Sequence, residues 1–156
     1  MAKKNLSAGL LMYRVRAGRL EVLLAHPGGP YWLNKDAGAW TIPKGLVDEG
    51  EEVLESAKRE FEEETSFKPN GEFIPLGQVK QKAGKVVHAW AFEGDLDPSA
   101  IKSNTYREQW PPKSGQWKTF PEIDRAEFFP LDVARTKINS AQAEFLSRLE
   151  ALVTAR

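Results

Sequence analysis

The chain has 156 residues, a length typical of a single domain, and 41% of them are hydrophobic, which is enough for a buried core. Its 22 basic residues balance its 22 acidic ones, so the strongly positive charge that marks proteins binding duplex nucleic acid is absent. The sequence has no cysteine, which excludes disulfides, thiolate metal sites and cysteine nucleophiles. We therefore expect one domain over residues 1–156 that has no duplex nucleic acid as a partner.

The N-terminal segment and the apolar stretches indicate a protein that does not associate with a membrane. Two lysines precede a short apolar run, which meets Arg14 too early for a signal peptide. No stretch approaches the roughly 18 consecutive apolar residues of a transmembrane helix. We expect a cytoplasmic protein that is a monomer or a homodimer.

The first third of the chain has the pattern of a hairpin, a loop and a short strand. Two apolar runs surround a short turn that contains Gly18, which is typical of a β-hairpin. The segment that follows is broken by glycines and prolines and therefore predicts a loop. The expected elements are strands over residues 6–15 and 20–25, a loop over residues 26–40 and a short strand over residues 40–42.

The second half of the chain predicts further strands, a long irregular segment and two helices. Irregular segments of that length are uncommon in compact domains and are often functional. Together with a central helix, this order predicts an α/β fold in which a mixed β-sheet lies between α-helices. The expected elements are strands over residues 73–82, 85–93 and 124–129, an irregular segment over residues 94–121, and helices over residues 130–137 and 139–153.

Residues 51–65 have the clearest helical pattern in the chain. Leu54, Ala57 and Phe61 recur at the spacing that places apolar side chains on one face of a helix. We expect that face to pack against the sheet.

Four glutamates crowd the end of this helix, in the sequence KREFEEET. At 100° per residue, Glu60, Glu63 and Glu64 share a face that borders the apolar stripe, whereas Glu62 lies on the opposite flank. A partly buried carboxylate is costly without a counterion, and like charges at this spacing repel by about 0.2–0.5 kcal/mol per pair. The pattern fits either a solvated acidic surface or a site for a cation. Hard cations such as Mg²⁺ or Mn²⁺ prefer oxygen ligands, and Arg59 lies where it can orient Glu63.

A longer pattern surrounds these glutamates. The stretch GLVDEGEEVLESAKREFEEETSF resembles the Nudix box, G-x5-E-x7-R-E-U-x-E-E-x-G-U, in which U is a bulky apolar residue. The segments WTIPKG, HPGGPYW and FPEIDRAEFF also resemble bacterial members of the Nudix family. Ser66 stands where the box has its final glycine, which closes the helix and often has a positive φ. The matching positions are Gly45, Glu51, Arg59, Glu60, Phe61, Glu63, Glu64 and Phe67.

The resemblance implies a Nudix fold and a metal-dependent hydrolase that cleaves a nucleoside diphosphate linked to another group. It implies that Arg59 pairs with Glu51 and orients the metal ligands. It implies a structural role in the box for Phe61 and Ser66. The serine in place of glycine puts the geometry of the helix end in doubt more than the identity of the metal ligands. The ion, Mg²⁺ or else Mn²⁺, would be held by oxygen atoms of Gly45, Glu60, Glu63, Glu64 and Glu122.

The resemblance leaves the general base open, because some family members use a box glutamate and others use a glutamate on a later loop. Glu122, in FPEIDRAEFF, matches the later-loop position, and Glu108 is a second candidate. A pyrophosphate bridge repels an attacking hydroxide, so metal ions would neutralise its charge and activate a water. The carboxylate would then accept the proton of that water.

Several residues outside the box are candidates for binding the substrate. Lys44 precedes the box glycine and is either a phosphate contact or an exposed strand end. Tyr31, Trp32 and Trp110 lie on expected loops, where aromatic rings either stack on nucleobases or cover the core. Arg107 lies near Trp110, in a segment that suits a polyphosphate tail and a base, or else is a proline-stiffened surface loop.

We expect a small-molecule nucleotide as the substrate. The PKG sequence before the box resembles family members that hydrolyse diadenosine tetraphosphate, so dinucleoside polyphosphates and (d)NTPs are the first expectation. The alternatives are removal of pyrophosphate from RNA 5′ ends and a nucleotide-binding sensor without turnover. An acidic helical surface for a protein partner would leave the spacing of Gly45, Glu51 and Arg59 unexplained.

Overall fold

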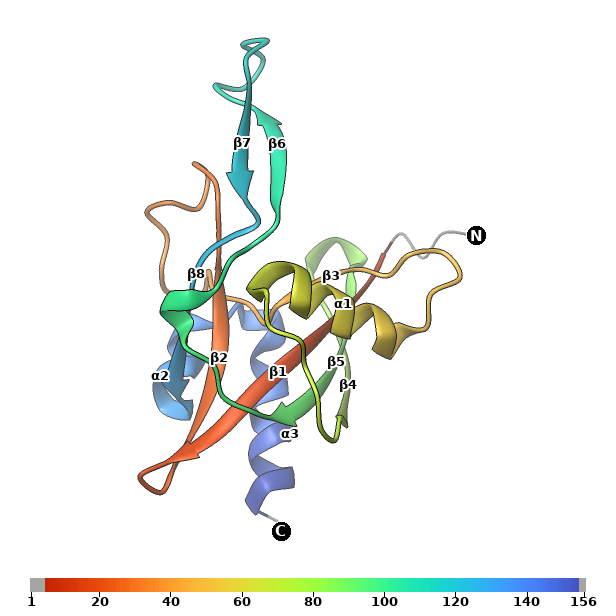
Figure 1. Ribbon diagram of the computed structural model, residues 1–156, viewed down its shortest axis with the longest axis vertical. Helices are drawn as coiled ribbons and strands as arrows, with labels where there is room; N and C mark the ends of the chain where they lie inside the picture. Colours follow the sequence, from red (N-terminus) through yellow and green to blue (C-terminus); the bar gives the residue numbers. More distant parts are fainter. Residues whose placement is uncertain (1–4, 155–156) are drawn as a thin grey trace.

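The computed structural model describes residues 5–154, which form a central sheet, a projecting hairpin and α-helices (Figure 1). The strands are β1 (Leu6–Arg16), β2 (Arg19–Pro27), β3 (Lys44–Leu46), β4 (Ile74–Lys80), β5 (Val86–Glu93), β6 (Thr105–Gln109), β7 (Trp117–Pro121) and β8 (Ile123–Pro130). The helices are α1 (Val53–Thr65), α2 (Leu131–Lys137) and α3 (Ala143–Thr154), and the 3₁₀ turns are η1 (Lys82–Gly84), η2 (Pro98–Ala100) and η3 (Ser140–Gln142). No helix within residues 5–154 combines the length and the apolar character needed to cross a membrane.

The central sheet is mixed, because it combines parallel and antiparallel pairings. The strand order is β4-β5-β1-β2-β8, and β3 pairs with β1 beside this path. β1 runs parallel to β5, with Leu6 opposite Val86, whereas the pairings of β1 with β2 and of β2 with β8 are antiparallel. This arrangement confirms the expected α/β fold with a mixed sheet between helices.

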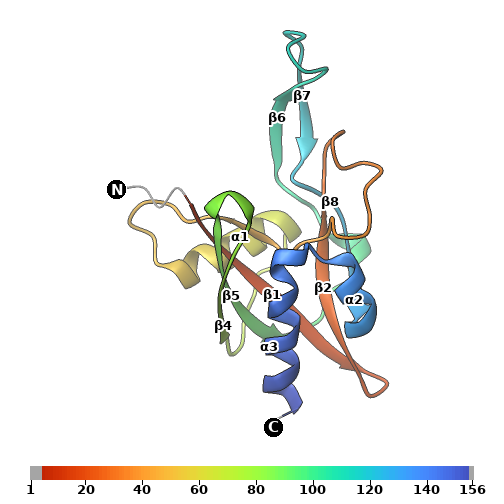
Figure 2. The same cartoon turned by 180° about the vertical axis from the view of Figure 1, so that it is seen from behind.

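Helices cover both faces of the sheet, as two opposite views of the molecule show (Figure 1, Figure 2). On one face, Phe61 of α1 packs in a buried cluster with Leu10 of β1. On the other face, Phe145 of α3 packs in a second cluster with Leu11 of β1. Leu10 and Leu11 are consecutive residues, so their side chains point to opposite faces of the strand. The strand therefore reads as a continuous apolar run, because both of its faces are buried.

The first strand, β1, changes its partner along one edge. β2 pairs with it over Tyr13–Arg16, and β3 pairs with it over Ser7–Gly9. Between these pairings, residues 40–43 run between β1 and β2, and the Leu10 N–H donates to the Pro43 carbonyl at 3.2 Å. This inserted segment leads directly into β3 and so places β3 beside the end of α1.

Most of the expected elements are confirmed, with shifted ends. The strands β1, β2, β4, β5 and β8 and the helices α1, α2 and α3 lie where the sequence pattern predicts them. The helix α1 begins at Val53 rather than at residue 51, and residues 140–142 form a 3₁₀ turn before α3 begins at Ala143. These shifts affect the ends of the elements and leave their order unchanged.

The short strand expected over residues 40–42 is wrong. Trp40 and Thr41 make isolated bridges, and the regular strand that pairs with β1 is Lys44–Leu46. Trp40 is 1% exposed, because its ring fills the space between the sheet and α2 as part of the core. Its apolar character therefore reflects packing and not a place in the regular sheet.

The expectation of an irregular segment over residues 94–121 is also wrong in part. Within it, β6 and β7 form an antiparallel hairpin, in which Thr105 pairs with Pro121 and Gln109 pairs with Trp117. The hairpin projects away from the central sheet (Figure 1). Because neither of its faces is buried in a core, its sequence does not need the alternation of apolar and polar residues by which strands are recognised.

Phe61 should be the position of α1 that is most sensitive to truncation. Its side chain is fully buried, and its ring packs edge-on against Phe92 with 5.3 Å between the ring centroids. We predict that Phe61→Ala lowers the free energy of unfolding by about 3–5 kcal/mol, through lost burial and the cavity left behind. Urea unfolding measures this change, and Glu62→Ala on the exposed flank is the control, with an expected change below about 0.5 kcal/mol. Equal losses in the two variants would contradict this packing.

Candidate active site

Arg59 on α1 is the centre of an ion-pair network. Its Nε and Nη2 donate to the two carboxylate oxygens of Glu51 at 2.9 and 3.0 Å, and its Nη1 donates to Glu63 at 2.9 Å. The two bonds from Arg59 hold the pKa of Glu51 below its usual value. They also tie the segment before the helix to the helix itself. The predicted pairing of Arg59 with Glu51 is thus present in the structure.

Glu60 and Glu64 lie one turn apart on α1, at the margin of the core. Glu64 is 8% exposed, which agrees with its predicted place next to Ala57 on the helical wheel. Burial raises the pKa of Glu60 to about 7 and that of Glu64 to about 8, and the negative charge of Glu122 adds to both shifts. Arg59 lowers the pKa of Glu60 and Lys44 lowers that of Glu64, but neither charge offsets the effect of burial. The charged forms of both carboxyl groups are therefore destabilised unless another cation binds.

Glu122 reaches the same region from the link between β7 and β8. Its main-chain N–H donates to the Asn104 carbonyl at 2.8 Å, and the Asn104 N–H donates to the Glu63 carbonyl on α1 at 2.9 Å. Burial raises the pKa of the Glu122 carboxyl, and Lys44 opposes this shift. Main-chain hydrogen bonds therefore hold Glu122 beside the end of α1, although it is far from α1 in the sequence.

β3 contributes Lys44 and Gly45 to this region. A Cβ atom at Gly45 would overlap the Glu60 carboxylate, so the absence of a side chain leaves room for that carboxylate beside β3. Lys44 lowers the pKa of both Glu64 and Glu122, because its positive charge favours their charged forms. The close approach of the Glu60 carboxylate to Gly45 explains why the motif begins with glycine.

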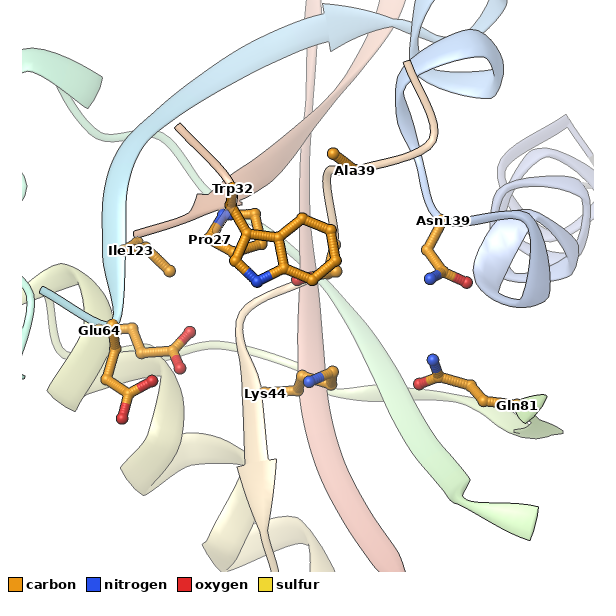
Figure 3. Close-up of a pocket in the computed structure, with 10 residues that line it drawn as sticks. Pro27, Trp32, Ala39, Lys44, Glu64, Gln81, Ile123 and Asn139 are labelled. Carbon is orange, nitrogen blue, oxygen red and sulfur yellow. The ribbon is translucent and has the colours of Figure 1, made fainter. Parts of the chain in front are cut away.

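Two cavities meet at these residues, and their walls share Lys44, Glu64 and Glu122. The first, of about 370 Å³, is called the acidic cavity; its wall also includes Gly45, Asp48, Arg59, Glu60, Lys85 and Asn104. The second, of about 310 Å³, is called the Trp32 cavity; its wall also includes Trp32, Pro27, Ala39, Thr41, Gln81, Ile123 and Asn139. Figure 3 shows the Trp32 cavity, with Glu64 on one side, Lys44 below and the indole of Trp32 across it.

The donor groups of the acidic cavity fit a hard divalent cation. They are carboxylate and main-chain oxygens, and no histidine lines this cavity. Within residues 5–154, no three His, Cys, Asp or Glu side chains are already gathered closely enough to hold a metal ion. Nevertheless the half-buried Glu60 and the buried Glu64 line the same cavity as Glu122, and a cation such as Mg²⁺ or Mn²⁺ would favour their charged forms.

The structure brings many of the predicted site residues together. Trp32, a candidate for stacking on a nucleobase, lines the Trp32 cavity. Glu63 lines neither cavity, because its side chain is 39% exposed and is paired with Arg59. The predicted residues that line the acidic cavity are Lys44, Gly45, Arg59, Glu60, Glu64 and Glu122.

The other predicted residues lie apart from the two cavities. Tyr31 is next to Trp32 in the chain but is 63% exposed. Arg107 and Glu108 are on β6 and Trp110 follows it, on the projecting hairpin (Figure 1), and none of them lines either cavity. Their part in binding or catalysis stays a prediction.

Sequence reasoning missed several polar residues of the two cavities. Gln81 and Asn139 line the Trp32 cavity, and Lys85 and Asn104 line the acidic cavity. Each lies in or beside a connecting segment, outside the motif and outside any apolar pattern. Folding alone brings them to the site, so the sequence contains no signal that would have identified them.

Ser66 ends α1 in the left-handed conformation, with φ 67° and ψ 14°. Its N–H donates to the Glu62 carbonyl at 2.8 Å, and its hydroxyl donates to the Lys102 carbonyl. The positive φ that the box glycine would adopt is therefore kept by a serine. The serine adds a hydrogen bond from the helix end to the segment that leads toward Asn104.

Comparison with known proteins gives consistent matches. A family model described as the NUDIX domain matches residues 3–149. The chain is 42% identical over 61 residues to bis(5′-nucleosyl)-tetraphosphatase [asymmetrical] of Caenorhabditis elegans. The matched residues cover 39% of this chain and 40% of that protein. It is 45% identical over 64 residues to Nudix hydrolase 10 of Arabidopsis thaliana, covering 41% of this chain and 22% of that protein. The matches thus span less than half of these relatives.

A solved structure of a C. elegans Ap4A hydrolase binary complex resembles the whole fold. Its TM-score is 0.69 at 22% sequence identity, and the match covers 97% of this chain and 98% of that one. At this level of identity the likeness shows the fold. The likeness covers nearly all of the chain.

The cost of a side chain at Ser66 can be measured by comparing two variants. Both Ser66→Ala and Ser66→Gly lose the hydroxyl that binds the Lys102 carbonyl. Alanine keeps the unfavourable positive φ, whereas glycine adopts it freely. We predict that Ser66→Ala is less stable than Ser66→Gly by about 1 kcal/mol in denaturant unfolding. A Gly variant less stable than the Ala variant would contradict the left-handed helix end.

The acidic cavity should make stability depend on pH and on divalent cations. In the metal-free protein, Glu60 and Glu64 keep their protons up to about pH 7 and pH 8, whereas their ordinary pKa is 4.5. Between these values the folded protein binds more protons than the unfolded chain, so the free energy of unfolding falls as the pH rises. In EDTA we predict a lower Tm at about pH 8.5 than at about pH 5.5. Mg²⁺ should raise the Tm more at the higher pH.

The matched variants for this measurement are Glu64→Gln and Glu62→Gln. The first removes one of the two buried titrating groups, so the pH dependence of the Tm should flatten. The second changes an exposed glutamate of the same helix and should leave the pH dependence as it is. The same pH dependence in both variants would show that the buried carboxyl group does not cause it.

Proposed function

Because the chain belongs to the NUDIX family, whose domain model matches residues 3–149, we propose that it hydrolyses a pyrophosphate linkage in a nucleotide. The proposed enzyme is a Nudix pyrophosphohydrolase that depends on a divalent metal ion and cleaves a nucleoside diphosphate linked to another group. One observation supports this most. Two glutamates of the motif, Glu60 and Glu64, border a single acidic cavity together with Lys44 and Glu122, and this cavity adjoins a second one with an aromatic wall.

We assign the metal, Mg²⁺ with Mn²⁺ as an alternative, to the acidic cavity. When bound, it would neutralise phosphate charge and lower the pKa of a coordinated water. Glu63 is available to it, because Arg59 binds Oε2 and no hydrogen bond to Oε1 is found within residues 5–154. Arg59 and Glu51 then serve to orient this carboxylate. The proposed ligands are oxygen atoms of Gly45, Glu60, Glu63, Glu64 and Glu122.

The remaining tasks are to bind phosphate and to accept a proton. Lys44 is a compact positive charge at the boundary of the two cavities, where it suits a phosphate oxygen. Glu122 suits the role of general base, because it borders both cavities and burial shifts its pKa upward. Glu108 is exposed on the hairpin and lines neither cavity, whereas Glu122 borders both. These facts favour Glu122.

The favoured substrates are dinucleoside polyphosphates, with (d)NTPs next. This choice rests on the similarity to a tetraphosphatase and to an Ap4A hydrolase fold, together with the presence of two adjoining cavities. Removal of pyrophosphate from RNA 5′ ends would call for a basic track leading to the site. A sensor without turnover is disfavoured, because every glutamate of the motif is present.

Glu63→Gln should abolish turnover while the fold survives. The substitution removes one proposed ligand but leaves an exposed side chain of nearly the same shape. We predict a fall in kcat of at least about 100-fold with diadenosine tetraphosphate and Mg²⁺. The matched control is Glu62→Gln, on the opposite flank of α1, which should keep its activity and its Tm. Undiminished activity of Glu63→Gln would overturn the assignment of Glu63 as a ligand.

The activity itself is tested with a panel of substrates. Purified protein with Mg²⁺, and then with Mn²⁺, is given diadenosine tetraphosphate, dNTPs, nucleotide sugars and 5′-triphosphorylated RNA, and the products are separated by chromatography. We expect one class to be hydrolysed far faster than the others, and EDTA to stop the reaction. Metal binding without turnover of any compound would favour the sensor.

A further inference from the structure

The Trp32 cavity has a polar end that the proposed hydrolysis does not use. Figure 3 shows the carboxamides of Gln81 and Asn139 on the side of the cavity away from Glu64, with Lys44 between the two sides. Gln81 follows β4, and Asn139 precedes η3. Two amides from distant parts of the chain therefore face the cavity together.

Hydrogen-bonding groups of both amides are available to a ligand. The Oδ1 of Asn139 accepts the Ala141 N–H at 2.9 Å, which fixes the side chain and leaves its Nδ2 as a donor. Within residues 5–154, no hydrogen bond engages the Gln81 carboxamide, which offers both a donor and an acceptor. The polar end of the cavity thus presents one fixed donor and one adaptable group.

The aromatic wall of the cavity is also held in place. Trp32 lies on the loop after β2, and its N–H donates to the Gly29 carbonyl at 3.3 Å. The loop is anchored by the buried ring of His26, whose Nε2 lies 2.6 Å from the Lys35 carbonyl and whose Nδ1 lies 2.8 Å from Asp124. These contacts reduce the freedom that a ligand would otherwise have to restrict on stacking against Trp32.

We propose that the Trp32 cavity binds a purine nucleobase of the substrate, which stacks on Trp32 and is read at its edge by Gln81 and Asn139. This inference rests on the proposed function, because it places the phosphates at Lys44 beside the acidic cavity. The edge of a purine or a pyrimidine offers a hydrogen-bond acceptor next to a donor, which matches one amide donor and one amide acceptor. The choice of a purine rests on its two fused rings, which offer a larger stacking face than a pyrimidine ring.

The arrangement gives the substrate a direction. The base occupies the Trp32 cavity, and the phosphate chain crosses the boundary at Lys44, Glu64 and Glu122 into the acidic cavity. The linkage to be cleaved then lies among the motif carboxylates. Binding of the base therefore fixes which phosphate faces them.

The proposal is tested by calorimetric binding of AMP and of ribose 5-phosphate, which lacks the base, in the presence of Mg²⁺. The variants are Trp32→Ala, Gln81→Met and Asn139→Ser, the last of which keeps an oxygen that can accept the Ala141 N–H. Gln78→Met, at an exposed position of β4, is the matched control. Thermal unfolding confirms that each variant is folded.

We expect AMP to bind at least about tenfold more weakly to Trp32→Ala and about fivefold more weakly to each amide variant. Binding to Gln78→Met should equal that of the parent protein, and ribose 5-phosphate should bind all five proteins alike. The proposal is overturned if AMP binds the three cavity variants as tightly as the parent, if ribose 5-phosphate loses affinity as AMP does, or if the parent does not bind AMP.

Turnover of diadenosine tetraphosphate by the same proteins separates this proposal from the proposed function. Base-dependent binding of AMP, with no turnover of diadenosine tetraphosphate or of any other compound in the substrate panel, would refute the hydrolase and leave the base cavity standing. Turnover that is unchanged in the three cavity variants, with AMP binding that is equally unchanged, would refute the base cavity and leave the hydrolase standing.

Discussion

The burial of Phe61 is the constraint on which the site depends. A helical side chain that points into the core fixes the direction of its neighbours, and Glu60 and Glu64 lie on the flank of the same buried face. Packing Phe61 against Phe92 therefore carries two carboxyl groups to the margin of the core, where burial raises their pKa. The apolar core supplies the free energy that holds these groups in an unfavourable position. The cost of that position is what makes the cavity attractive to a cation.

The open end of α1 supports the part of the site that is not in the helix. The last carbonyl groups of a helix have no partner within it. Here the carbonyls of Glu63 and Thr65 accept the N–H groups of Asn104 and Lys102 at 2.9 and 3.2 Å. The Asn104 carbonyl in turn accepts the Glu122 N–H at 2.8 Å. Hydrogen bonds through Asn104 thus satisfy a carbonyl group at the end of α1 and also hold Glu122 in place. They connect the motif to a residue far along the chain.

The features that the sequence could predict are those whose interacting residues lie close together along the chain. The helix and its buried stripe depend on neighbours within one segment, so their spacing was enough to predict them. The pairing of Arg59 with Glu51 followed from the resemblance to the Nudix box. The absence of a regular strand over residues 40–42 could not be predicted, because an apolar residue inserted between two strands resembles a residue of a strand. The hairpin of β6 and β7 has no buried face, so its sequence lacks the alternation of apolar and polar residues that would have predicted strands. Gln81 and Asn139 meet only because β4 and η3 approach the same cavity.

The two cavities therefore differ in how freely they can change. The acidic cavity is built mostly from one continuous segment around Gly45, in which a side chain added at the glycine would overlap Glu60. The Trp32 cavity takes its wall from five separate regions, and Gln81 and Asn139 lie outside the motif. Substitutions there can alter the base that is bound without moving the carboxylates. A motif in one segment can thus define the reaction of a family, while dispersed residues set the substrate of each member. Lys44 borders both cavities, so we expect a change at Lys44 to affect the proposed binding and the proposed reaction together.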